Sequence, residues 1–224
     1  MERPTSLLKD LLVVLGLFLL VFVAGGALAC SIMIFTSTPT WVSGLATQLT
    51  FLTASLAIMK LLNSSWSEFG FKIRYFGLLR ASIISLVSSS ALASPALLLP
   101  ELSCTQAPAE LTENLLVLAT LSLLVGPICE EVFFRGLLQS YLLLKGHRRL
   151  SIAVPALLFS AVHAIPFSSS GFMALLIILL GALILSLIAG YFRAMKGSLL
   201  HPIAVHFWFN FTGFIIYLTS PHHI

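Results

Sequence analysis

Charged residues are scarce in this sequence. Asp, Glu, Lys and Arg together make up 9% of the 224 residues, whereas hydrophobic residues make up 58%. Soluble domains contain about 25% charged residues, so this chain cannot cover a water-exposed surface with polar groups. The 12 Lys and Arg residues form no basic stripe, which excludes nucleic-acid binding. Only 3 cysteines occur, without a C-x-x-C pair, which excludes a disulfide framework or a thiolate zinc site. We therefore expect an integral membrane protein.

Long uncharged runs predict an all-α fold, a polytopic membrane helix bundle of about seven transmembrane helices. No charge falls between Asp10 and Lys60, which is room for two crossings of about 20 residues with a break at 36–41. The other predicted spans are 81–100, 114–144, two within 150–192 separated at 163–171, and 198–218. An eighth helix over 64–78, lying in the membrane interface, is an alternative. Without repeats or linkers, residues 1–224 are predicted to form a single membrane domain.

The positive charges predict an orientation. With seven spans, every Lys and Arg except Arg135 lies on the same side as the N-terminus. The loop 101–113 on the other side contains Glu101, Glu110 and Glu113. Because cytoplasmic loops carry an excess of Lys and Arg, we expect the N-terminus in the cytoplasm and the C-terminus outside.

A few polar residues interrupt the predicted spans. They are Glu130, Glu131 and Arg135 on span four, His163 on span five, and His206 with Asn210 on span seven. Polar groups at this depth are costly and usually face the bundle interior or a water-filled cavity. Each is therefore a candidate functional residue.

Their spacing predicts which of them pair. Glu131 and Arg135 are four residues apart and share a helix face, so we expect a structural ion pair. Glu130 lies about 100° around the helix and is expected to be a free carboxylate. The nearby Gly126-Pro127 predicts a kink.

Depth supports a shared site. Counted from the charged edge, Glu130, His163 and Asn210 all lie roughly 21 Å into the membrane at about 1.5 Å per residue. Spans four, five and seven are therefore expected to line one cavity.

Three motifs carry a resemblance to a known family. Span four contains E-E-x-x-x-R from Glu130, span five contains F-x-x-x-H ending at His163, and span seven contains H-x-x-x-N from His206. In this order the motifs resemble those of the CAAX-protease and bacteriocin-processing (CPBP or Abi) family of intramembrane peptidases. E-E-x-x-x-R alone is weakly specific, whereas three motifs in order are strongly specific. The resemblance covers a peptidase core of about residues 115–215, and the first three spans carry no motif.

The resemblance implies an intramembrane endopeptidase that hydrolyses a peptide bond of a membrane-associated protein or peptide, prenylated or otherwise anchored. Carried over by position, Glu130 is the general base that activates a water, assisted by His163. His206 and Asn210 bind the developing oxyanion, and no cofactor takes part.

Two alternatives stay open. Glu130, His163 and His206 form a possible His₂Glu zinc set, as in a metalloendopeptidase. However, H-E-x-x-H is absent, and Asn210 is a poor zinc ligand and a good hydrogen-bond donor. The metal-free glutamate mechanism is therefore favoured. The second alternative is a non-catalytic membrane protein that uses the same polar cavity to bind a partner or relay protons.

Overall fold

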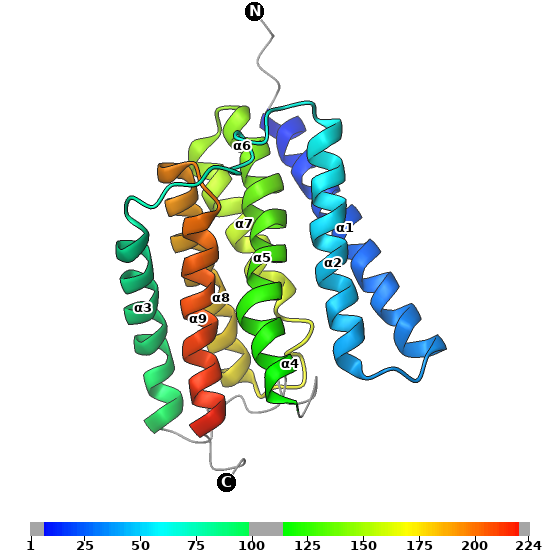
Figure 1. Ribbon diagram of the computed structural model, residues 1–224, viewed down its shortest axis with the longest axis vertical. Helices are drawn as coiled ribbons and strands as arrows, with labels where there is room; N and C mark the ends of the chain where they lie inside the picture. The colour runs from blue at the N-terminus through cyan, green and yellow to red at the C-terminus, as the bar shows by residue number, and fades with distance from the viewer. Residues whose placement is uncertain (1–6, 99–113, 220–224) are drawn as a thin grey trace, which may run out of the picture.

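The structure is an all-helical bundle (Figure 1). This computed structural model describes residues 7–98 and 114–219. Six of its helical segments are α1 (Leu7–Phe35), α2 (Thr40–Leu61), α3 (Leu78–Leu98), α7 (Arg148–Val162), α8 (Phe172–Lys196) and α9 (Leu200–Thr219). The seventh runs without interruption from Leu115 to Leu144 and carries the E-E-x-x-x-R motif. We call it the motif helix. It consists of α4 (Leu115–Thr120), η2 (Leu121–Val125), α5 (Gly126–Glu131), η3 (Val132–Gln139) and α6 (Ser140–Leu144), where η marks a π-helical stretch.

The predicted polytopic helix bundle is confirmed, with one span corrected. Among the described residues, five helices are long and apolar enough to cross a membrane: α1, α2, the motif helix, α8 and α9. Predicted span five is shorter than a crossing, because α7 has 15 residues, or about 22 Å, against about 30 Å of hydrocarbon. The chain continues from its end as turns at 163–170. That residues 1–224 form a single domain stays a prediction.

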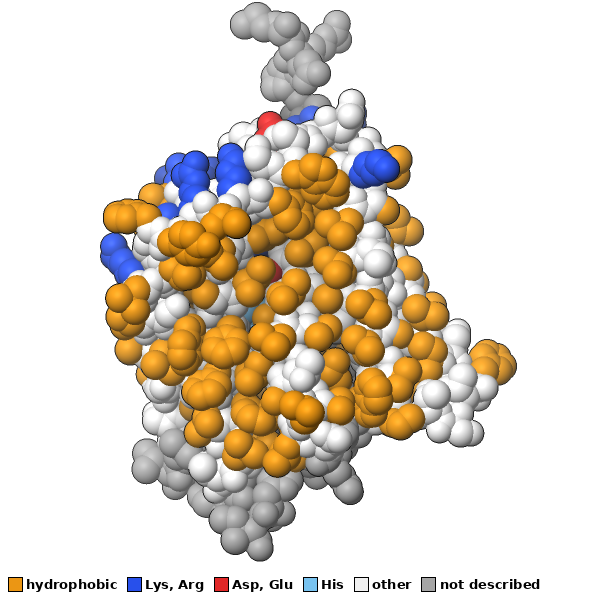
Figure 2. Space-filling view, viewed as in Figure 1, with side chains coloured by type: hydrophobic (Ala, Val, Ile, Leu, Met, Phe, Trp, Pro, Cys, Tyr) orange, Lys and Arg blue, Asp and Glu red, His pale blue; other side chains and the backbone are white. Residues whose placement is uncertain are grey.

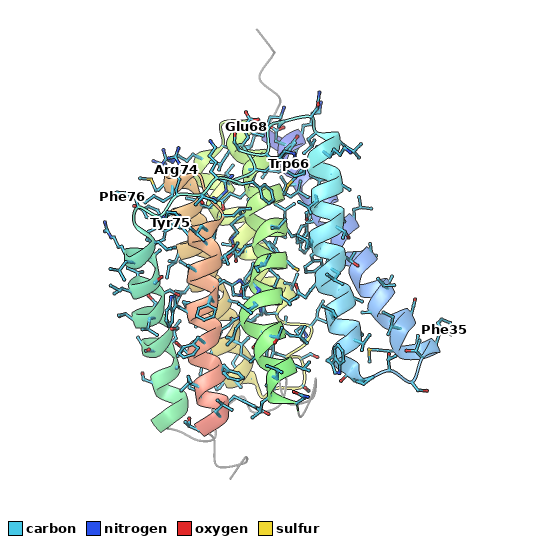
Figure 3. All side chains as sticks on the ribbon, in the orientation of Figure 1. Phe35, Trp66, Glu68, Arg74, Tyr75 and Phe76 are labelled. Carbon is cyan, nitrogen blue, oxygen red and sulfur yellow. The ribbon has the colours of Figure 1, made fainter. Side chains whose placement is uncertain are left out.

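The alternative of an eighth helix over 64–78 is wrong. This segment consists of turns and irregular backbone (Figure 3). Asn63 precedes it with a φ of 56°, Gly70 within it has a φ of 94°, and Gly77 near its end has a φ of 89°. A right-handed helix needs negative φ throughout, so these three positions prevent one. We call residues 62–77 the α2–α3 loop.

Charge is segregated along the bundle. Figure 2 shows Lys and Arg side chains at the end where α1 begins, while hydrophobic side chains cover much of the rest of the visible face. This is the distribution expected of a membrane-embedded bundle with one basic edge. The side of the membrane on which that edge lies stays a prediction. Glu101, Glu110 and Glu113 lie outside the described residues.

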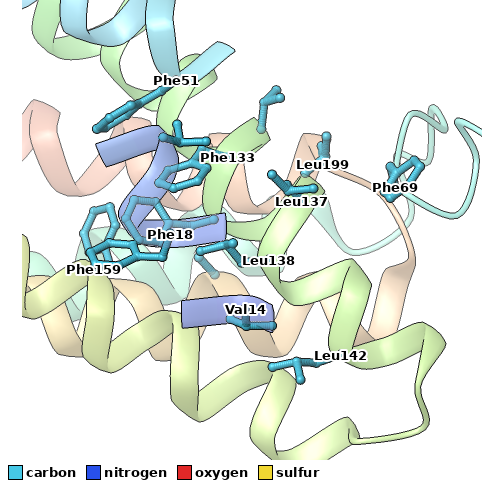
Figure 4. Packing of buried hydrophobic residues seen from close by; sticks show 14 of the residues in the cluster. Val14, Phe18, Phe51, Phe69, Phe133, Leu137, Leu138, Leu142, Phe159 and Leu199 are labelled. Carbon is cyan, nitrogen blue, oxygen red and sulfur yellow. The ribbon is translucent and has the colours of Figure 1, made fainter. Parts of the chain in front are cut away.

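Aromatic rings form the core beside the motif helix (Figure 4). Phe133 and Phe134 are buried, with ring centroids 4.8 Å apart. Phe51 of α2 contacts Phe133 at 5.0 Å, and Phe159 of α7 contacts Phe134 edge-on at 5.1 Å. Such pairs contribute about 0.5–1.5 kcal/mol each beyond area burial. The residues between Glu131 and Arg135 thus anchor α2 and α7 to the motif helix.

A substitution at Gly70 would test how tightly the α2–α3 loop is packed. A Cβ there would lie 2.7 Å from Arg193 Nε, whereas Gly146 has a similar φ of 83° and nothing within 4 Å. We expect Gly146→Ala to cost about 1–2 kcal/mol from its backbone alone. Gly70→Ala should cost about 1–3 kcal/mol more, because Arg193 must move. Thermal unfolding in detergent measures both, and equal losses would contradict the packing.

Candidate active site

A π-helical stretch, η2 (Leu121–Val125), precedes Gly126-Pro127, where the sequence predicts a kink. The Gly126 N–H donates to the Leu121 carbonyl, one residue further back than in an α-helix, and Pro127 has no N–H. The carbonyl of Ser122 therefore loses its usual backbone donor. Asn210 of α9 supplies one instead, with its Nδ2 2.8 Å from that oxygen. The third motif is thereby attached to the helix that carries the first.

The ion pair predicted between Glu131 and Arg135 is present. Arg135 Nη1 lies 3.0 Å from Glu131 Oε1, and both side chains are buried. Arg135 Nη2 donates to Ser186 Oγ of α8 at 2.6 Å, and the guanidinium lies 5.0 Å from the centre of the Phe159 ring. A buried charge needs such compensation because desolvation is expensive. The pair thus joins the motif helix to α7 and α8.

His206 lies between the two glutamates. Its Nδ1 is 2.8 Å from Glu131 Oε1, and its Nε2 is 3.8 Å from Glu130 Oε2. Because a carboxylate only accepts, His206 donates through Nδ1. Glu131 therefore fixes the orientation of the histidine in addition to neutralising Arg135. The spacing of the motifs gave no sign of this second contact, because it joins residues 75 positions apart.

The expectation that Glu130 is a free carboxylate is wrong. Gln48 of α2 donates from Nε2 to Glu130 Oε1 at 2.7 Å. Gln48 Oε1 is buried and, within the described part of the chain, has no hydrogen-bond partner. Sequence reasoning missed this residue. The available signal was that Gln48 is the only amide side chain between Asp10 and Lys60.

His163 is the residue directly after the last helical residue of α7, Val162. Its Nδ1 donates to the Phe159 carbonyl at 2.7 Å, which leaves Nε2 as the acceptor nitrogen of a neutral ring. The Phe159 ring contacts His163 at 4.6 Å and His206 at 5.5 Å. Glu130 and His206 both lie close enough to act on His163 electrostatically. One buried aromatic ring thus positions both motif histidines.

The site is close to the apolar surface of the bundle. Glu130 keeps 17% of its side chain exposed, whereas Glu131 has none. Figure 2 shows an acidic and a histidine side chain within the otherwise apolar face between α9 and α5. On this side an apolar groove of about 200 Å³ runs between the motif helix, at Leu124 and Ile128, and α9, at Ile203 and Phe207. The groove separates the helices that carry Glu130 and His206.

The zinc alternative finds no support in this geometry. Among the described residues, no group of three or more His, Cys, Asp or Glu side chains is arranged to hold a metal ion. The Glu130, His163 and His206 set therefore does not make a ready-formed site.

Fold and site together define a polytopic membrane protein with a polar cluster inside its bundle. Residues 112–212 match the model of a family described as Rce1-like, type II CAAX prenyl endopeptidase Rce1-like. This match covers somewhat less than half of the chain and supports the CAAX-protease family that the three motifs predicted. The family indicates an intramembrane endopeptidase that acts on a protein or peptide. Comparison with curated proteins and with solved structures gave no match.

The two glutamates should differ in their effect on folding. Glu131→Gln leaves Arg135 without its counter-charge, and breaking a buried pair typically costs about 3–5 kcal/mol. We expect little of this variant in the membrane fraction. Glu130→Gln should accumulate normally, because the glutamine oxygen still accepts from Gln48. Abundance and monodispersity in detergent measure both, and normal yields of Glu131→Gln would contradict its structural role.

Proposed function

We propose that the protein is an intramembrane endopeptidase in which Glu130 activates a water for attack on a peptide bond. The observation that carries the proposal is that the two adjacent carboxylates have different partners. Glu131 is committed to Arg135 and His206, whereas Glu130 is partly exposed and, among the described residues, contacts Gln48 and His206. A base that must accept and return a proton cannot also be a permanent counter-ion.

His163 suits the role of assistant to Glu130. With its Nδ1–H held by the Phe159 carbonyl, the neutral ring presents the lone pair of Nε2. That nitrogen can accept a hydrogen from the water that Glu130 deprotonates. The tautomer needed for this role is the one that the hydrogen bond selects.

His206 and Asn210 are proposed as the donors to the oxyanion, under two conditions. His206 uses its Nδ1–H for Glu131, so its Nε2 donates only when the ring carries both protons. Glu130 and Glu131 together balance that charge and the charge of Arg135. Asn210 uses one of its two N–H groups for the Ser122 carbonyl, and the second remains for the oxyanion. Preorganised donors of this kind contribute about 3–4 kcal/mol each.

Gln48 is proposed as a positioning residue. By occupying Oε1 of Glu130 it leaves Oε2, the oxygen next to His206, to act on the water.

The substrate is proposed to be a membrane-associated protein or peptide, prenylated or otherwise anchored, that reaches the site from the bilayer. The apolar groove between the motif helix and α9 supports this route, because it borders the helices that carry Glu130 and His206. We further propose that the N-terminus is cytoplasmic and the C-terminus outside. No metal or cofactor has a part in the proposed mechanism.

Loss of the base should remove cleavage without removing the protein. Membrane-protein termini from cells that produce the wild type or Glu130→Gln, compared by quantitative proteomics, should reveal peptides shortened only by the wild type. With such a substrate, purified Glu130→Gln should be slower by about 10³ or more, and the wild type should keep its activity after chelation. Stoichiometric zinc that tracks with activity would establish the metalloendopeptidase. Identical termini with a retained cellular phenotype would establish the non-catalytic alternative.

Gln48→Met should lower turnover without weakening substrate binding. The substitution keeps the length of the side chain but removes its donor, and a hydrogen bond to a charged group is worth about 1.5–3 kcal/mol. We expect kcat to fall about 10- to 100-fold with KM unchanged. Ser55→Ala is the matched control, because Ser55 is a buried polar residue of the same helix whose hydroxyl has no hydrogen-bond partner in the described part of the chain. A rise in KM alone would assign Gln48 to substrate binding instead.

A further inference from the structure

The α2–α3 loop exposes large apolar side chains at the basic end of the bundle. Ile73 is 77% exposed, Tyr75 70% and Phe76 86%. Figure 3 shows Arg74, Tyr75 and Phe76 together at the corner above α3. Aromatic side chains gain stability at the membrane–water interface, where the ring is buried and polar groups stay hydrated. The exposure of this cluster therefore indicates contact with lipid rather than with water.

The loop is held rigidly in this position. Its backbone accepts hydrogen bonds from α8, α9 and the turn between them: Arg193 Nη2 to Glu68 O at 2.7 Å, Leu199 N to Gly70 O at 2.9 Å, and His201 Nε2 to Phe76 O at 3.1 Å. Phe69 is fully buried beneath it. A surface fixed in this way loses little conformational entropy when a ligand binds.

A groove of about 140 Å³ lies beside this loop, between α3 and α8. Arg80 and Lys196 line it at the charged edge, and Ile84 and Phe192, each four residues away, line it about 6 Å deeper. In the described part of the chain neither cation has a carboxylate partner, and the Lys196 Nζ lies 4.6 Å from the centre of the Phe76 ring. The groove thus combines a cationic mouth with an apolar floor.

We propose that this groove binds an anionic phospholipid of the surrounding bilayer. The phosphate lies between Arg80 and Lys196, and an acyl chain runs past Ile84 and Phe192. Phe76 and Tyr75 enter the headgroup region beside it. Charge complementarity favours an anionic lipid over a zwitterionic one. The cationic headgroup of a zwitterionic lipid would be repelled by the two cations already in the groove. Basic pockets between membrane helices bind anionic headgroups for this reason. The proposal is independent of peptidase activity.

The test uses the purified full-length protein in phosphatidylcholine nanodiscs with and without phosphatidylglycerol. Native mass spectrometry should show phosphatidylglycerol retained on the wild type, with a higher Tm than in phosphatidylcholine alone. The double variant Arg80→Gln/Lys196→Gln should bind about 25-fold more weakly, since each cation near an anionic surface contributes about fivefold. The matched control is Lys145→Gln/Arg149→Gln, which removes the same charge from exposed positions at the same end, outside the groove.

The outcomes separate the possible ligands. Retention by the control and loss by the groove variant supports the proposal. Equal losses from both variants would show a diffuse electrostatic attraction and overturn it. Equal protection by glycerol 3-phosphate, which lacks acyl chains, would assign the groove to a soluble phosphate compound. The wild-type comparison between the two lipid mixtures needs no substitution, so a lack of preference there would also overturn the proposal.

Discussion

The buried guanidinium of Arg135 is the constraint on which the rest of the site depends. A cation with no solvent exposure inside an apolar bundle must be neutralised and hydrogen-bonded, and here Glu131 and Ser186 perform these tasks. Glu131 also binds His206 through the same oxygen that faces Arg135. The motif helix, α8 and α9 therefore meet at one point. The contact that orients His206 is thus made by the same carboxylate that neutralises Arg135.

Buried backbone groups also need hydrogen-bond partners, and one such partner links α9 to the motif helix. Pro127 and the π-helical stretch before it deprive the Ser122 carbonyl of a donor, and Asn210 satisfies it. At membrane depth an unsatisfied carbonyl is expensive, so the bond fixes α9 against the motif helix. α7 differs, because it is too short to cross the membrane and irregular backbone follows it. It ends at His163, and the following turns place irregular backbone at a depth where it is tolerated only if buried or lining a cavity.

The sequence alone predicted the features that follow from hydropathy and helical spacing. These include the helix bundle, five of the seven predicted spans among the described residues, and the Glu131–Arg135 pair. It did not predict the Gln48–Glu130 contact, because that bond joins residues 82 positions apart and no periodicity relates them. π-Helical register is equally invisible, since it depends on where tertiary contacts remove a backbone partner. The prediction of an interfacial helix over 64–78 was wrong because two glycines in this segment have positive φ. An amphipathic composition does not reveal that conformation.

The charge balance of the cluster links this structure to the proposed chemistry. Arg135 carries one positive charge and Glu130 and Glu131 carry two negative charges, so with neutral histidines one negative charge remains. Because Arg135 contacts Glu131, the excess resides on Glu130, the more exposed carboxylate. A proton taken from water by Glu130 leaves the Arg135–Glu131 pair intact, whereas a proton on Glu131 would leave Arg135 unpaired in a medium that penalises isolated charge. Of the two adjacent carboxylates, Glu130 is therefore the one that we propose as the base.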